Sequence, residues 1–290
     1  MSYIIAIGLY LVLLMVYGLV IAHKKVKTTD DMMTGGHKIP FIILVGSLLA
    51  TWCGGGGITG SAGVVYSGGP WVGALAYAAP PIGIILLYFI AGRVRKTNKV
   101  TVPEIMGARY GAAASVISAL CVMLAYVGVL ATQLKAAADI LVLLCHSSGI
   151  EISHGVALAI CTVIIVIITV GGGLVSVAYS DAVSALIMIG GFFLAIPILV
   201  HVANSQGAVL PPEKASFTGG LSGWTLLGYF LPGLSLMLGD QNMLQRFASA
   251  KNSDEAKKSN IGMFIGELLV IISIIALVTQ AAKLYPSLDT

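Results

Sequence analysis

Long apolar runs, separated by short polar segments, dominate this sequence. Each run is close to the roughly 20 residues that an α-helix needs to cross the hydrocarbon core of a bilayer. The runs occupy residues 3–22, 41–66, 72–92, 113–145, 155–171, 177–202, 223–245 and 261–282. Charged residues make up only 10% of the chain, whereas soluble domains carry roughly 25%. The sequence therefore predicts an all-α integral membrane protein with about eight transmembrane helices.

Basic residues are distributed unevenly between the connecting segments. If successive runs cross the membrane, the segments 23–40, 93–111 and 246–260 share one side, and they hold four, five and four of the 16 Lys and Arg residues. The positive-inside rule then places these three segments in the cytoplasm and the N-terminus outside. This distribution accounts for the net charge of +4 without nucleic-acid binding. We predict a multi-pass protein of the cytoplasmic membrane.

Four consecutive glycines, Gly54–Gly57, interrupt the second run. The spacing Gly55-x-Gly57-x-x-Gly60 matches a dinucleotide fingerprint, but that motif needs a strand before it and an acidic residue about 20 positions later. No Asp or Glu occurs between Asp31 and Glu104. The glycines therefore do not indicate a nucleotide site.

Two interpretations of the glycines remain. They allow two helices to pack closely, as small residues do in membranes, or they unwind a helix whose free carbonyls line a binding cavity. We favour the second, because four glycines exceed what packing needs and each weakens a helix by up to about 1 kcal/mol. Pro232-Gly233 predicts a second interruption in the run 223–245. Two discontinuous helices are typical of a transporter with a binding site between them.

Three stretches together resemble the sodium:solute symporter family: Ser47–Gly69, Thr169–Val183 and Leu236–Ser259. Within them, ATWCGGG and GGLVSVAYSDAV are most similar to the choline-transporter branch. The resemblance implies an inverted-repeat (5+5) core after one extra helix, so that residues 1–290 form a single transmembrane transporter domain. The extra helix would be 3–22, the first repeat 41–202, and the first two helices of the second repeat 223–282. The last three core helices would then be absent.

The resemblance also implies a site. Sodium would be bound at the backbone carbonyls of Ala50 and Cys53, with Asp181 on its route. The solute would contact Trp52, Gly55, Gly56, Asp240 and Glu267. Alternatives remain open for four of these residues. Asp181 equally suits the N-terminus of its helix, where a carboxylate is favoured. Asp240 and Glu267 equally suit a buried structural pair, and Trp52 suits packing against lipid or a helix.

Other polar and reactive residues have structural explanations. Lys135 and Asp139 are one helical turn apart and predict an ion pair. Trp71 predicts an anchor at the membrane interface. The four cysteines fall in or beside apolar runs without a CxxC pair, which predicts small hydrophobes buried in the membrane and not a metal site or disulfide framework.

These features predict sodium-coupled symport of a small organic solute by alternating access. The solute would be a cation or zwitterion, because two acids and an indole face would suit an ammonium group. The sequence has no P-loop, catalytic triad or metal cluster, so we do not predict an enzyme. The alternatives are a symporter-like sensor that binds solute without transport, and an inactive half of a transporter.

Overall fold

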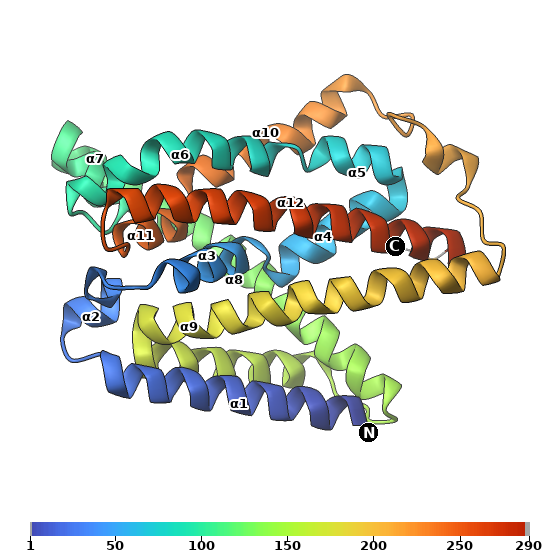
Figure 1. Cartoon of the computed structure of the whole chain (residues 1–290), viewed down its shortest axis with the longest axis horizontal. Helices are drawn as coiled ribbons and strands as arrows, with labels where there is room; N and C mark the ends of the chain where they lie inside the picture. Colours follow the sequence, from blue (N-terminus) through green and yellow to red (C-terminus); the bar gives the residue numbers. More distant parts are fainter. Residues whose placement is uncertain (1, 288–290) are drawn as a thin grey trace.

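The computed structural model of the chain describes residues 2–287. Within these residues the fold is built of helices, and the only β-type pairing is an isolated parallel bridge between Ile39 and Ala250. Figure 1 shows the helices packed side by side along one long axis. The elements are α1 (Ser2–Lys25), α2 (Thr29–Thr34), η1 (Gly35–His37), α3 (Phe41–Trp52), α4 (Gly55–Gly68), α5 (Pro70–Ala76), α6 (Ala79–Thr97), α7 (Val102–Tyr110), α8 (Ala112–Ser147), α9 (His154–Ser205), η2 (Pro212–Ala215), α10 (Gly223–Gly239), α11 (Gln241–Ala248) and α12 (Ser253–Leu284).

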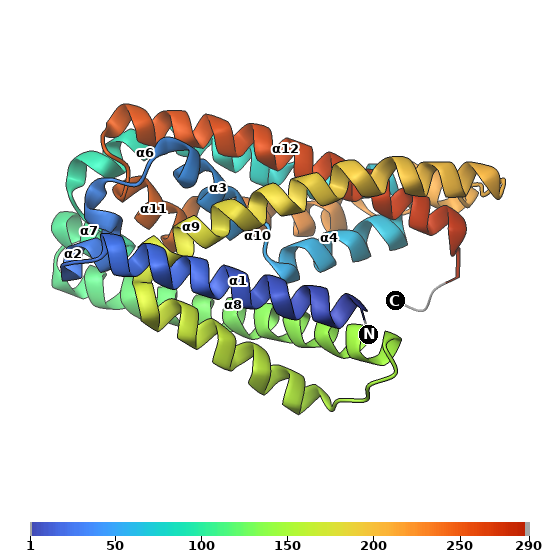
Figure 2. The same ribbon diagram turned by 60° about the horizontal axis from the view of Figure 1, so that its bottom comes forward.

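Five helical stretches in the described residues are long and apolar enough to cross a membrane, or six if α3 and α4, bent by 56°, form one span. The chain is thus a multi-pass membrane protein, but the expected count of eight spans is not confirmed. Two features lower the count. α10 has only 17 residues, and α9 counts once although it folds back on itself at Gly173, where φ is 55° and ψ is −149° (Figures 1 and 2).

The packed core lies between α3, α6, α11 and α12. Leu44 and Leu48 of α3, Ile84 of α6, Phe247 of α11 and Met263 of α12 are fully buried in one cluster. By contrast, many apolar side chains of α1, α8 and the first arm of α9 are exposed. An exposed apolar surface of this extent is unfavourable in water and is expected where helices face lipid. The core therefore holds the discontinuous helices, and α1, α8 and the α9 arm flank it.

The three basic segments meet at one end of the molecule, as the positive-inside argument requires. α2, α7 and α11 lie together there, while the N-terminus and η2 lie at the opposite end (Figure 1). Three hydrogen bonds to main-chain carbonyls join the basic segments. His37 Nδ1 lies 2.6 Å from the Ala248 carbonyl oxygen, Gln245 Nε2 donates to Met33 at 2.9 Å, and Arg95 Nε donates to Ala250 at 2.6 Å. We call this end the basic end.

A capping box starts α2 at the basic end. The Thr28 hydroxyl oxygen accepts from the Asp31 amide, and the Asp31 carboxylate accepts from the Thr28 amide at 3.0 Å. Hydrogen bonds from the Lys27 amide and the Thr28 side chain hold the pKa of Asp31 below its ordinary value. The short helix is thus closed by its own first turn, which is the usual means of satisfying free amides at a helix start.

The second interruption is not where the sequence predicted it. α10 stays helical through Pro232-Gly233 and ends at Gly239, and the break falls at Asp240, before α11. A proline within a helix removes only its own amide and bends the helix. Asp240, however, starts a new helix by accepting from the Met243 amide at 2.9 Å. A further interruption, at Tyr77 and Ala78, separates α5 from α6 and was not predicted.

Several smaller predictions concern single side chains. The ion pair on α8 is confirmed, because Lys135 Nζ lies 2.7 Å from Asp139 Oδ2, and His154 Nε2 lies 2.8 Å from the other carboxylate oxygen. The four cysteines are free. Trp71 is 54% exposed, with its ring 5.8 Å from that of Phe217; its place relative to the membrane surface stays a prediction.

Candidate functional site

The glycine run breaks the helix, as predicted. α3 ends at Trp52, Cys53 leaves the helical region with ψ at 45°, and α4 begins at Gly55. The Gly54 amide donates to the Trp52 carbonyl at 2.9 Å and so leaves the Ala50 carbonyl without its usual helical donor. Among residues 2–287, no backbone amide donates to the Cys53 carbonyl. The break therefore frees the carbonyls of Ala50 and Cys53.

The same glycines also pack tightly against α8. A Cβ atom at Gly54 would lie 2.8 Å from Cδ of Gln133, and one at Gly55 would lie 3.2 Å from Cβ of Ala136. Gln133 Oε1 accepts from the Gly56 amide at 3.0 Å and so satisfies one free amide at the start of α4. The two interpretations of the glycines are thus compatible: the helix breaks here, and its backbone approaches α8.

Glu267, on α12, lies beside the break. It is 1% exposed, the Cys53 thiol donates to its Oε2 at 3.9 Å, and Trp52 lines the same small cavity. None of the described Lys, Arg or His side chains lies within ion-pair distance of it. A charged group at membrane depth costs at least about 2.5 kcal/mol. Glu267 therefore has no described cation to offset the cost of carrying a charge at this depth.

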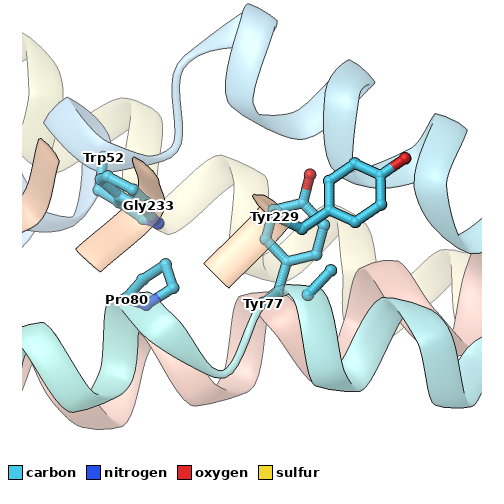
Figure 3. Close-up of a pocket in the computed structure, with 6 residues that line it drawn as sticks. Trp52, Tyr77, Pro80, Tyr229 and Gly233 are labelled. Atoms are coloured by element: carbon cyan, nitrogen blue, oxygen red, sulfur yellow. The ribbon is translucent and has the colours of Figure 1, made fainter. Parts of the chain in front are cut away.

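Trp52 also lines a cavity of about 180 Å³ that does not include Glu267. Figure 3 shows Trp52 and Gly233 at one side of it and Tyr77 and Tyr229 at the other. Its walls come from three interrupted or bent helices: the end of α3, the α5–α6 break, and α10 next to Pro232. A smaller cavity of about 40 Å³ shares Trp52 and Tyr77 and reaches Glu267. Aromatic rings and a buried acid thus border two neighbouring cavities that share Trp52 and Tyr77.

Asp181, on α9, lies away from the break. It contacts α3 at Ser47, which is about two helical turns before the break. Its Oδ2 accepts from the Ser47 hydroxyl at 2.8 Å and from Nη2 of Arg246 at 3.0 Å, while Nε of Arg246 donates to Ser47 Oγ at 2.7 Å. We call these three residues the clamp, since they join α9, α3 and α11. The alternative interpretation of Asp181 as a helix cap is wrong, because helical residues precede it in the second arm of α9.

Asp240 does not line either cavity. Its Oδ1 accepts from the Tyr126 hydroxyl at 3.0 Å and from the Met243 amide at 2.9 Å, so the side chain caps α11. The structure therefore brings Trp52, Cys53 and Glu267 together around the glycines and leaves Asp240 and Asp181 apart from them.

Sequence reasoning missed Tyr77, Tyr229 and Gln133. Two of them had a signal in the sequence. Pro80 and Pro81 mark a helix start directly after Tyr77, and an amide in the apolar run of α8 needs a polar partner. Tyr229 had none, because its place in the cavity depends on how α10 packs against α5 and α6.

Fold and site together define a class: helical membrane proteins with a discontinuous helix beside buried cavities, an arrangement typical of transporters. The chain belongs to the sodium:solute symporter family, since the family's sequence model matches residues 32–287. The members of this family are transporters and not enzymes, and they couple a solute to sodium.

Three comparisons illustrate the relationship. The high-affinity choline transporter 1 of Drosophila melanogaster is 25% identical over 99% of this chain and 46% of its own length. The sodium/sialic acid symporter NanT of Aliivibrio fischeri is 24% identical over 89% of this chain and 52% of its own length. A solved structure of a Na+-coupled sialic acid symporter, in a substrate-bound outward-open state, shares the fold with a TM-score of 0.77 at 19% identity, covering 98% of this chain and 60% of that one. The chain spans about half the length of the curated relatives it matches.

Proposed function

We propose that this chain forms the sodium- and solute-binding part of a sodium-coupled symporter. The observation that carries the proposal is the break between α3 and α4, which borders both the buried Glu267 and an aromatic cavity. Membership of the sodium:solute symporter family supports it. Discontinuous helices place free backbone groups at membrane depth only where those groups line a cavity or bind an ion.

Sodium is proposed to bind the free carbonyls of Ala50 and Cys53. Hard cations prefer oxygen ligands, and these two carbonyls have lost their helical donors. The Cys53 thiol takes no part, because it donates to Glu267. Asp181 is proposed to meet sodium only in a conformation in which Arg246 has left its carboxylate, since the guanidinium occupies it here.

The solute is proposed to carry an ammonium group and to occupy the cavity of Trp52, Tyr77 and Tyr229. Aromatic faces attract quaternary ammonium ions, and each such contact contributes about 2 kcal/mol or more when the site is desolvated. Glu267 would supply the opposite charge from the adjoining cavity, and Gly55 and Gly56 would allow close approach to the backbone. Relatives named as choline transporters fit this chemistry. Asp240 is assigned to the cap of α11 and not to the solute.

We further propose that the basic end faces the cytoplasm, with the N-terminus outside the cell. In a variant without the native cysteines, a membrane-impermeant thiol reagent added outside intact cells should label Gly219→Cys and spare Lys99→Cys. The reverse labelling would invert the orientation.

Transport is tested with the protein as its gene encodes it, reconstituted in proteoliposomes. An inward sodium gradient should drive uptake of radiolabelled choline, and an equal potassium gradient should not. The double variant Gly55→Leu/Gly56→Leu should insert into the membrane but lose the sodium dependence. Sodium-dependent binding without uptake would favour a sensor. Uptake of sialic acid in preference to choline would refute the ammonium-bearing solute and leave the sodium site standing.

A further inference from the structure

A polar pocket of about 560 Å³ lies at the basic end, between the end of α6 and the start of α12. Arg93, Lys96 and Lys257 line it together with a single carboxylate, Asp254, which leaves an excess of two positive charges. None of the three cations forms an ion pair or a side-chain hydrogen bond with another described residue. The pocket thus carries a net positive charge.

An apolar groove next to this pocket lies toward the middle of α6 and α12. It measures about 230 Å³, shares Tyr88 and Phe89 with the pocket, and is otherwise lined mostly by aliphatic and aromatic side chains of α6 and α12, including Ile85 and Ile261. Phe89 is 62% exposed and Ile261 47%, so this wall faces outward from the bundle. α6 and α12 lie side by side along this whole stretch (Figure 1).

Two details show that the pocket and groove are built into the helix packing. Gly92 of α6 makes room for the stem of Lys257, because a Cβ there would lie 2.8 Å from Lys257 Cε. Asn260, one turn after Lys257 and 1% exposed, donates to the Ile84 carbonyl at 2.7 Å, while its Oδ1 is buried in the groove wall without a partner among the described residues.

We propose that pocket and groove bind one anionic phospholipid, with its phosphate among Arg93, Lys96 and Lys257 and an acyl chain along Ile85 and Ile261. The cations follow the last apolar turns of α6 and precede those of α12, which is the depth of lipid headgroups. A soluble anion would use the pocket but gain nothing from the groove. A zwitterionic lipid would use the groove, but the ammonium group of its own headgroup would be repelled by the cations of the pocket. Only an anionic lipid satisfies both parts.

The test measures lipid binding by native mass spectrometry of the intact protein, titrated with dioleoylphosphatidylglycerol or dioleoylphosphatidylcholine. The first should bind at least 10-fold more tightly. In Arg93→Gln/Lys96→Gln/Lys257→Gln this preference should disappear. Affinity for phosphatidylglycerol should fall on the order of 100-fold, because each cation near a membrane surface contributes about fivefold to the affinity for an anionic lipid. The matched control Lys24→Gln/Lys27→Gln/Lys99→Gln removes the same charge from elsewhere at the basic end and should retain the preference.

The groove is tested separately. Ile261→Trp should fill it and weaken phosphatidylglycerol binding about 10-fold, whereas Ile265→Trp, equally lipid-facing but outside the groove, should not. Glycerol 3-phosphate, a free headgroup, should not compete at millimolar concentration. Equal losses in the two charge triples, equal losses in the two tryptophan variants, or competition by glycerol 3-phosphate would each overturn the proposal. Unchanged detergent-extracted yield and melting temperature establish that every variant is folded.

Discussion

Two acids inside the helix bundle, Asp181 and Glu267, are held in opposite ways. Asp181 is held by the clamp, in which Arg246 and Ser47 satisfy one of its oxygens. Glu267 lies beside the break, accepts from the Cys53 thiol, has no ion pair with a described residue, and is less exposed than Asp181. A membrane protein retains a buried acid where the fold supplies its cation or where a ligand does. The contrast separates an acid that is paired within the fold from Glu267, the acid that we propose to contact the solute.

The largest expected effect concerns the clamp. Arg246→Met leaves Asp181 without its cation and should reduce stability by about 3–5 kcal/mol, as the loss of one partner of a buried pair does. The measurement is the melting temperature of the purified protein in detergent. Asp181→Asn/Arg246→Met removes both charges and should recover part of the loss. A single variant that melts like the wild type would show that the clamp contributes nothing to stability.

The next effect concerns the contact between the break and α8. Gly54→Ala drives a methyl group into the amide end of the Gln133 side chain, which must move away from the Gly56 amide that it accepts from. The variant should destabilise the protein by about 1–3 kcal/mol, the usual cost of a buried donor left without its acceptor. Gly63→Ala is the matched control on α4, because nothing lies within 4 Å of its added methyl group. It should be neutral or slightly stabilising. Equal melting of both variants would mean that the glycines are needed only for the break.

Glu267→Gln tests the second acid of the contrast. Because Glu267 has no ion pair with a described residue, the free energy of unfolding of this variant should change by less than about 1 kcal/mol, far less than in Arg246→Met. Affinity for choline should fall at least 10-fold, or about 1.4 kcal/mol, while its neutral isostere 3,3-dimethylbutanol should bind within a factor of two of the wild type. Calorimetric titration in sodium buffer measures both. Equal losses for the two ligands would refute a charge contact.

The smallest effect separates Asp240 from the binding region. Asp240→Ala should cost about 1 kcal/mol, the usual value for a lost helix cap, and should leave choline affinity unchanged. Ser222→Ala, which removes the cap of α10, provides a second cap loss for comparison of melting temperatures. A 10-fold loss of choline affinity in Asp240→Ala alone would return Asp240 to the solute site.

Local signals in the sequence predicted much of this arrangement. Four glycines predicted the break in the right place, because helix propensity is a property of neighbouring residues. The position of the second break could not be read from Pro232 alone, since a proline bends a helix that continues and an aspartate eight positions later starts a new one. The partner of Asp181 was also beyond reach. Arg246 lies 65 positions away, and only the packing of α11 against α3 brings them together.

The main-chain contacts at the basic end have a mechanical consequence. Arg246 sits on α11, and residues on both sides of it are tied to other segments: Gln245 to Met33, Ala248 to His37, and Ala250 to Arg95. A rotation of α11 that withdraws Arg246 from Asp181 must either break these ties or carry the end of α6 and the segment after α1 with it. α11 and the residues just after it therefore connect the three basic segments. A movement of one segment is transmitted to the other two unless these hydrogen bonds break.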